Sequence, residues 1–88
     1  MKIKSAPTDW SITLMWSIPE TMRGNSVLVI RKENGYPQSR EDGNVVYLGN
    51  GTKAVDKDLV ADTEYFYRFF LLNSKGEIVG WTRYKEKT

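Results

Sequence analysis

Residues 63–72 read Thr63-Glu64-Tyr65-Phe66-Tyr67-Arg68-Phe69-Phe70-Leu71-Leu72. Aromatic and branched side chains of this kind favour extended backbone. Successive side chains of a strand point to opposite faces. One face of a strand here would carry the residues at 65, 67, 69 and 71, and the other those at 66, 68, 70 and 72. The stretch therefore predicts a long strand that is largely apolar on both faces.

The same period of two recurs along the chain. Ile12, Leu14 and Trp16 alternate with small polar residues, which predicts a half-buried strand that Pro19 ends. Residues 26–32 are apolar on both faces, as expected of an inner strand. Further strands are predicted at 45–48, 52–56 and 77–84, with a hairpin turn at 73–76. Residues 2–5 predict a short edge strand, and 85–88 are predicted to form a charged, linker-like tail.

About seven short strands separated by turn residues are typical of an all-β sandwich or barrel. No segment has the helical period over three turns. We predict a single domain over residues 1–88 with two antiparallel sheets in an immunoglobulin-like, Greek-key sandwich. The residues expected in its core are Ile12, Leu14, Trp16, Val27, Val29, Leu59, Tyr65, Tyr67, Phe69 and Leu71.

Composition narrows the function classes. The chain has no cysteine and no histidine, so disulfides, thiol chemistry and zinc sites are not expected. Most general-base and nucleophile constellations use histidine, so we expect neither an enzyme nor a cofactor. The 13 basic and 11 acidic side chains are interspersed along the chain, which gives no basic face for nucleic acid. No apolar run is long enough for membrane insertion.

At this point the residues resemble the fibronectin type III family. The stretch 12–16 resembles the family's second strand, which ends in a core tryptophan, here Trp16. Residues 56–67 resemble its pattern of aspartate, leucine, threonine and two tyrosines. The resemblance implies that Leu59 plugs the sandwich and that Tyr65 makes the tyrosine corner, with its hydroxyl bonded to nearby backbone. The stretches 29–37 and 42–52 resemble a bacterial or phage subset of the family.

The resemblance implies a non-catalytic structural, spacer or interaction module, excised from a larger multidomain protein. Its parent would be an exported bacterial protein, extracellular or at the cell surface, or a phage particle. The expected partners are neighbouring domains of the same parent chain, with polysaccharide or another protein as the alternative. The N-terminal residues show no signal peptide, which an internal module would also lack.

One face of the predicted sheet is more apolar than a wet outer face needs to be. We interpret this face as a possible interaction surface for a neighbouring domain or another protein. The competing interpretation is that the chain's own loop or a neighbouring module covers it. The residues of this predicted interaction face are Leu28, Ile30, Phe66, Arg68, Phe70, Leu72 and Trp81.

Other patterns have weaker functional interpretations. Arg23-Gly24-Asn25 lacks the carboxylate that an integrin-binding tripeptide needs, and Asn50-Gly51-Thr52 matches a glycosylation sequon but also suits a turn. The aspartates at 56, 58 and 62 suit turns better than a calcium loop, and Glu41 and Asp42 are adjacent rather than facing across a cleft. The remaining possibility, a sugar-stacking platform, would use Trp10, Tyr36, Tyr47, Trp81 and Tyr84.

Overall fold

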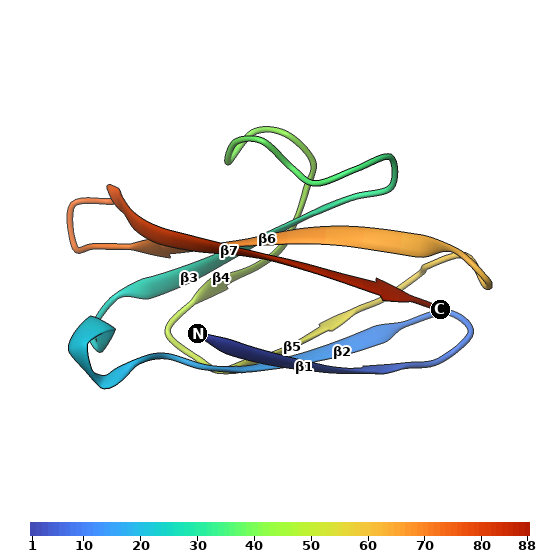
Figure 1. Ribbon diagram of the computed structural model, residues 1–88, viewed down its shortest axis with the longest axis horizontal. Coiled ribbons are helices and arrows are strands. Elements are labelled where there is room, and N and C mark those ends of the chain that lie inside the picture. The colour runs from blue at the N-terminus through green and yellow to red at the C-terminus, as the bar shows by residue number, and fades with distance from the viewer.

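The computed structural model describes residues 1–88 as seven antiparallel strands in two sheets packed face to face (Figure 1). One sheet has the order β1-β2-β5 and the other β4-β3-β6-β7. This confirms the predicted all-β sandwich, which is compatible with immunoglobulin-like and fibronectin type III folds. The bounds are β1 (Lys2–Pro7), β2 (Ile12–Ser17), η1 (Glu20–Met22, a 3₁₀ turn), β3 (Ser26–Lys32), β4 (Asn44–Gly49), β5 (Lys53–Asp56), β6 (Glu64–Leu72) and β7 (Ile78–Lys87).

The core lies between the two sheets and is built from alternate residues of their strands. All ten residues expected there are buried in one cluster, which confirms the prediction, and Ala54 joins them. The ring of Trp16 packs edge-on against Tyr47 and Phe69, at centroid distances of 5.3 and 5.4 Å. Burying each large apolar side chain contributes about 1.5–3 kcal/mol, so this cluster is the main source of stability.

Both terminal strands are longer than predicted. β1 pairs with β2 along its whole length, from Lys2 opposite Ser17 to Pro7 opposite Ile12. The predicted tail at 85–88 is wrong over 85–87, because β7 continues through Lys87, paired with Glu64 of β6. Lysines at 85 and 87 alternate with Glu86 along this edge. This half-exposed end of the strand is therefore as highly charged as a linker-like tail, which explains the wrong prediction.

Side chains from the two terminal strands close one edge of the sandwich. The hydroxyl of Ser5 on β1 lies 2.5 Å from the hydroxyl of Tyr84 on β7 and also bonds the carboxylate of Glu86. At the end of the chain, Thr88 donates to the carbonyl of Val60 and accepts from the amide of Thr63. These bonds link the last strand to the opposite sheet and to the loop before β6.

The long connection between β3 and β4, residues 33–43, folds over the outer face of the four-stranded sheet (Figure 1). Pro37 is fully buried there, and the ring of Tyr36 meets Phe66 edge-on at 5.1 Å. Arg40 reaches across to donate to the carbonyl of Gly76 at 2.7 Å. Gly43 has φ +140°, and a Cβ on it would lie 2.4 Å from the carbonyl oxygen of Arg31. Only glycine fits here, where the loop returns to the sheet at the start of β4.

Candidate functional site

The predicted interaction face divides into a buried centre and a more open margin. Leu28, Ile30, Phe70 and Leu72 form a second buried cluster, so the expectation of an exposed patch does not hold for these four. These side chains are buried because the 33–43 loop folds over this face of the sheet. A covering loop of the chain itself is one of the competing interpretations given above. Phe66 and Arg68 are half-buried, and Trp81 is 55% exposed. The guanidinium of Arg68 lies 4.1 Å from the centre of the Trp81 ring.

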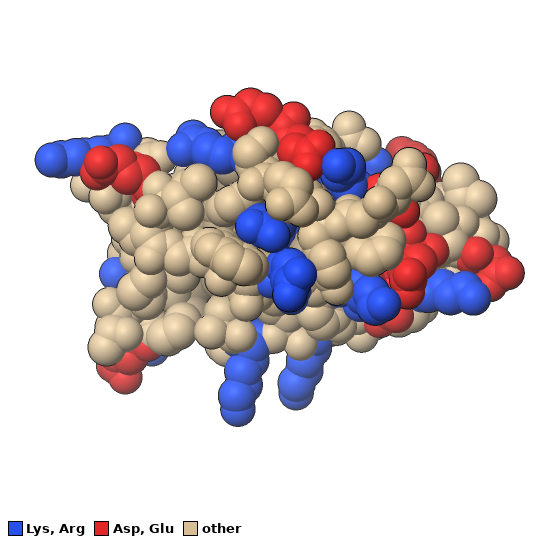
Figure 2. Space-filling model, turned by 45° about the horizontal axis from the view of Figure 1, so that its top comes forward, with Lys and Arg blue, Asp and Glu red and all other residues tan.

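A fringe of apolar side chains stays exposed on the edge strands of the same sheet. Val45 and Leu48 lie on β4, and Ile78 and Trp81 lie on β7, all exposed. Figure 2, which brings the top of Figure 1 forward, shows a largely uncharged surface with basic side chains both near its middle and at its margins, and acidic ones mainly toward its margins. Charges of both signs are therefore spread over this view of the molecule, rather than gathered by sign on one face.

The three signature residues lie in the core. Trp16 and Leu59 are buried, and the amide of Leu59 donates to the carbonyl of Trp10 at 2.9 Å. Tyr65 is also buried, and its hydroxyl accepts a 2.8 Å hydrogen bond from the amide of Val60. That bond joins the strand β6 to the loop that precedes it, and it satisfies a backbone donor that water would otherwise have to reach.

Asp56 is the only buried acidic side chain, and the two sheets share it. Its carboxylate accepts a 2.7 Å hydrogen bond from the Tyr67 hydroxyl and another of 2.7 Å from Arg31. Burial raises the pKa of the Tyr67 phenol well above its ordinary value, and the bond to Asp56 raises it further. Asp56 is therefore committed to holding β5 against β3 and β6.

The remaining aspartates and sequence motifs occupy turns. Asp58 and Asp62 have positive φ of 60° and 54° in the loop before β6, a conformation that aspartate tolerates better than most residues. Asp42 accepts from Lys32 and from the amide of Gln38, and both bonds lower the pKa of its carboxyl. Asn50 of the sequon accepts a 2.9 Å bond from Ser26. No group of His, Cys, Asp and Glu side chains is placed to hold a metal ion.

The aromatic residues proposed as a sugar platform do not come together. Tyr47 and Tyr84 pack against the core, and Tyr36 lies in the 33–43 loop against Phe66. Trp10 is exposed in the connection between β1 and β2, whereas Trp81 is on β7 of the other sheet. No continuous row of aromatic faces results, so a flat stacking platform of these five residues is not formed.

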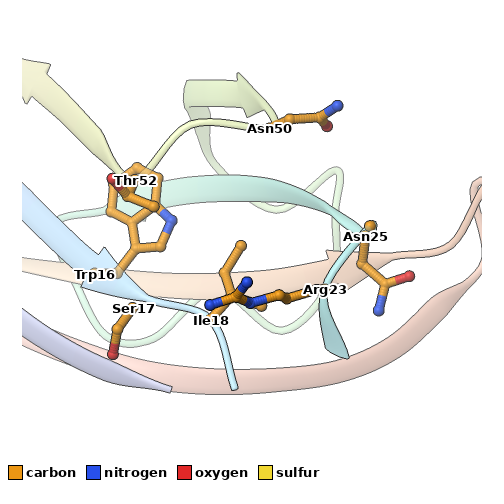
Figure 3. Close-up of a pocket in the computed structure, with 8 residues that line it drawn as sticks. Trp16, Ser17, Ile18, Arg23, Asn25, Asn50 and Thr52 are labelled. Atoms are coloured by element: carbon orange, nitrogen blue, oxygen red, sulfur yellow. The ribbon is translucent and has the colours of Figure 1, made fainter. Parts of the chain in front are cut away.

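A cleft opens at one end of the sandwich, between the β2–β3 and β4–β5 connections (Figure 3). Its volume is about 490 Å³, within the range of roughly 300–1,000 Å³ typical of small-molecule sites. The turn at 49–51 closes around Tyr47, whose hydroxyl accepts from the amide of Gly51 at 2.6 Å. The lining residues are Trp16, Ser17, Ile18, Arg23, Gly24, Asn25, Asn50 and Thr52.

One of the residues that line this end cleft, Trp16, carries an enclosed donor without a partner. Trp16 is 5% exposed, and its indole nitrogen has no hydrogen-bond acceptor. In Figure 3 this nitrogen lies on the edge of the ring that faces Arg23 and Asn25. A buried N–H without a partner costs about 1–3 kcal/mol. Arg31 and Arg68 each carry a buried side-chain nitrogen without a partner as well, so an unpaired donor of this kind is not particular to the cleft.

The sequence prediction missed this end cleft as a site. The sequence pattern places Trp16 only in the core, and Arg23-Gly24-Asn25 resembles only an integrin motif. The available signal was topological: the β2–β3 and β4–β5 connections both cross between the sheets at the same end. Two turns rich in Gly and Asn, at 23–25 and 49–52, then meet there.

Comparison with known proteins adds no assignment, because no protein-family model and no curated protein sequence matches the chain. No helix in the structure has the length and apolar character required to cross a membrane.

Proposed function

We propose that the chain is a fibronectin type III-like module that acts without catalysis, positioning neighbouring domains of a larger exported bacterial protein or phage particle. Support for the family comes from the strand order, from buried Trp16 and Leu59, and from the Val60–Tyr65 bond. Fold alone does not decide function, so the positioning role has to rest on a separate observation.

The position of the two termini carries the positioning role. In Figure 1 the N-terminus lies toward the end of the sandwich that carries the β2–β3 loop, and the C-terminus lies toward the opposite end. The molecule measures 37 × 22 × 16 Å. Domains attached at the two termini would be held apart by a packed body, rather than brought together on one side of it. The bonds of Ser5 and Thr88 anchor both terminal strands.

A non-catalytic role agrees with how the acidic groups are used. The one buried carboxylate, Asp56, is neutralised by Arg31 and bonded by Tyr67. Asp42, next to Glu41, is paired with Lys32 on the surface at 3.0 Å. An acid or base catalyst needs a group free to exchange its proton with a substrate, and these carboxylates are occupied by structural partners.

The alternative function is binding of a protein or polysaccharide through the exposed fringe of the outer sheet. Leu48 and Trp81, on opposite edge strands of the sheet, would be its main contacts, since both are large and exposed. Sedimentation equilibrium of the isolated chain and of Trp81→Ser tests whether this fringe associates. A positioning module is expected to be monomeric in both forms. A wild-type dimer that Trp81→Ser converts to a folded monomer would favour an interaction module instead.

A further inference from the structure

Two asparagines of the chain, Asn34 and Asn50, are each followed directly by glycine. In such a pair the backbone nitrogen of the glycine attacks the side-chain amide carbon of the asparagine, because no Cβ on the glycine obstructs the approach. A succinimide ring forms and ammonia leaves. Water then opens the ring at either carbonyl, which gives aspartate or isoaspartate. The whole sequence takes up one water and releases one ammonia, without oxidation or reduction.

At Asn34 both reacting groups are free. The residue is exposed, and neither its side chain nor the amide of Gly35 is hydrogen-bonded to the rest of the chain. After β3 ends at Lys32, the first hydrogen bond of the loop is the one that the Tyr36 carbonyl accepts from Gln38. The space around Gly35 is also open, since a Cβ there would meet no atom within 4 Å.

At Asn50 both reacting groups are held. Its side-chain oxygen accepts a 2.9 Å hydrogen bond from Ser26, and the amide of Gly51 donates to the Tyr47 hydroxyl at 2.6 Å. The attacking form of the glycine amide is the deprotonated one, and a hydrogen bond donated by its N–H stabilises the protonated form. The two asparagine–glycine pairs therefore share a sequence but differ in their hydrogen bonds.

Asn34 lies near the start of the 33–43 loop, which folds over the second buried cluster of the four-stranded sheet (Figure 1). Just after it, the ring of Tyr36 packs on Phe66 at 5.1 Å, and Pro37 is fully buried. Isoaspartate routes the main chain through the former side chain and lengthens it by one carbon atom before these two anchors. Aspartate introduces a carboxylate at the same position but leaves the main chain unchanged.

We propose that Asn34 is a site of spontaneous deamidation, from which the fold protects Asn50 through Tyr47 and Ser26. Isoaspartate at position 34 loosens the loop over the second buried cluster, so that this apolar face becomes exposed as the protein ages. The modification is a property of the 33–43 loop and does not depend on the chain being a positioning module.

Peptide mapping by mass spectrometry measures the two sites separately. Cleavage after lysine and arginine places Asn34 in the peptide 33–40 and Asn50 in the peptide 41–53, and the conversion of amide to acid changes the mass of each. After incubation of the folded chain in mildly alkaline buffer, Asn34 is expected to deamidate at least about tenfold faster than Asn50. In urea, which removes both hydrogen bonds at Asn50, the two rates should become similar.

Equal rates in the folded chain would overturn the proposal. A difference that persists undiminished in urea would also overturn it, because the difference would then come from the neighbouring sequence and not from the fold.

Tyr47→Phe tests the protecting bond. It removes the hydroxyl that holds the Gly51 amide and keeps the ring that packs against Trp16. Deamidation at Asn50 is expected to rise at least about fivefold in the folded variant, while the rate at Asn34 stays that of the wild type. The matched control is Tyr36→Phe, whose hydroxyl makes no hydrogen bond and which should leave the rate at Asn50 unchanged. An unchanged rate at Asn50 in Tyr47→Phe would contradict protection by this bond.

Binding of an anilinonaphthalene sulfonate dye, which reports exposed apolar surface, tests the loosening of the loop. The isoaspartate form, separated by chromatography from the aged protein, is expected to give a higher dye fluorescence than the fresh chain. Asn34→Asp, which supplies the carboxylate without lengthening the main chain, is expected to match the fresh chain. Equal fluorescence of the isoaspartate form and Asn34→Asp would overturn exposure of the apolar face by a lengthened loop.

Discussion

The hydroxyl of Tyr67 on β6 donates a 2.7 Å hydrogen bond to the buried carboxylate of Asp56 at the end of β5. These strands belong to different sheets, so the bond crosses the sandwich. Arg31 on β3 holds the other carboxylate oxygen at 2.7 Å. A buried charge is tolerated only when its partners satisfy it, and here the two donors come from adjacent strands of the sheet opposite Asp56.

Tyr67→Phe removes the hydroxyl and keeps the ring. We expect the free energy of unfolding to fall by about 1.5–3 kcal/mol, the usual contribution of a hydrogen bond to a charged group. Urea unfolding monitored by circular dichroism measures it. Tyr36→Phe is the control, since the Tyr36 hydroxyl makes no hydrogen bond, and its effect should stay within about 0.5 kcal/mol. Equal losses in the two variants would mean that the Asp56 bond adds nothing to stability.

The same tyrosine predicts how stability depends on alkaline pH. Burial and Asp56 raise the pKa of Tyr67 in the folded state, whereas a tyrosine in the unfolded chain ionises at about pH 10. The stabilising effect is therefore complete below pH 10 and is lost as pH rises above it, because only the unfolded chain releases the proton. The slope approaches about 1.4 kcal/mol per pH unit for one proton.

Urea midpoints between about pH 9 and 11.5 test this linkage. The wild type should lose stability more steeply than Tyr67→Phe over the upper part of this range. Parallel curves for the two proteins would show that Tyr67 ionises in the folded state as readily as in the unfolded chain.

The covered outer face predicts opposite outcomes for two aromatic residues that face each other on neighbouring strands. Phe70 is 3% exposed and is paired across the sheet with Trp81. Phe70→Ser should cost about 3–5 kcal/mol, as for other large losses of buried aromatic surface. Trp81→Ser should cost about 1 kcal/mol or less, because Trp81 is mainly exposed and loses chiefly its cation–π contact with the half-buried Arg68.

Thermal and urea unfolding of the two variants provide the comparison. If both substitutions cost little, the 33–43 loop does not cover the face in solution. An association study that used Phe70→Ser would confuse lost stability with a lost interface, so Trp81→Ser is the better surface probe.

The strands and the core could be predicted because they depend on local pattern. The period of two places Ile12, Leu14 and Trp16 on one face of a strand. Residues 26–32, which are apolar on both faces, indicate an inner strand. Both inferences need only the order of residues along one segment, since burial on a given face follows from the pleat.

What could not be predicted depends on contacts between distant segments. The loop at 33–43 covers the outer face through Tyr36 on Phe66 and Arg40 on Gly76, and no local pattern encodes either pairing. Asp56 has the sequence context of a turn residue, and only the meeting of three strands makes it a buried acceptor. The end cleft is likewise formed by two separate loops, so its residues share no motif.

The positioning role is tested most directly by the distance between two inert reporter domains fused to the ends of the chain. The chain has no cysteine, so one cysteine in each reporter gives a unique pair of spin labels. A flexible Gly/Ser linker of 88 residues has a broad distribution with a root-mean-square span of about 50 Å. We expect the module to give one narrow distance distribution that Trp16→Ala broadens. A distribution as broad as that of the flexible linker would contradict the positioning role.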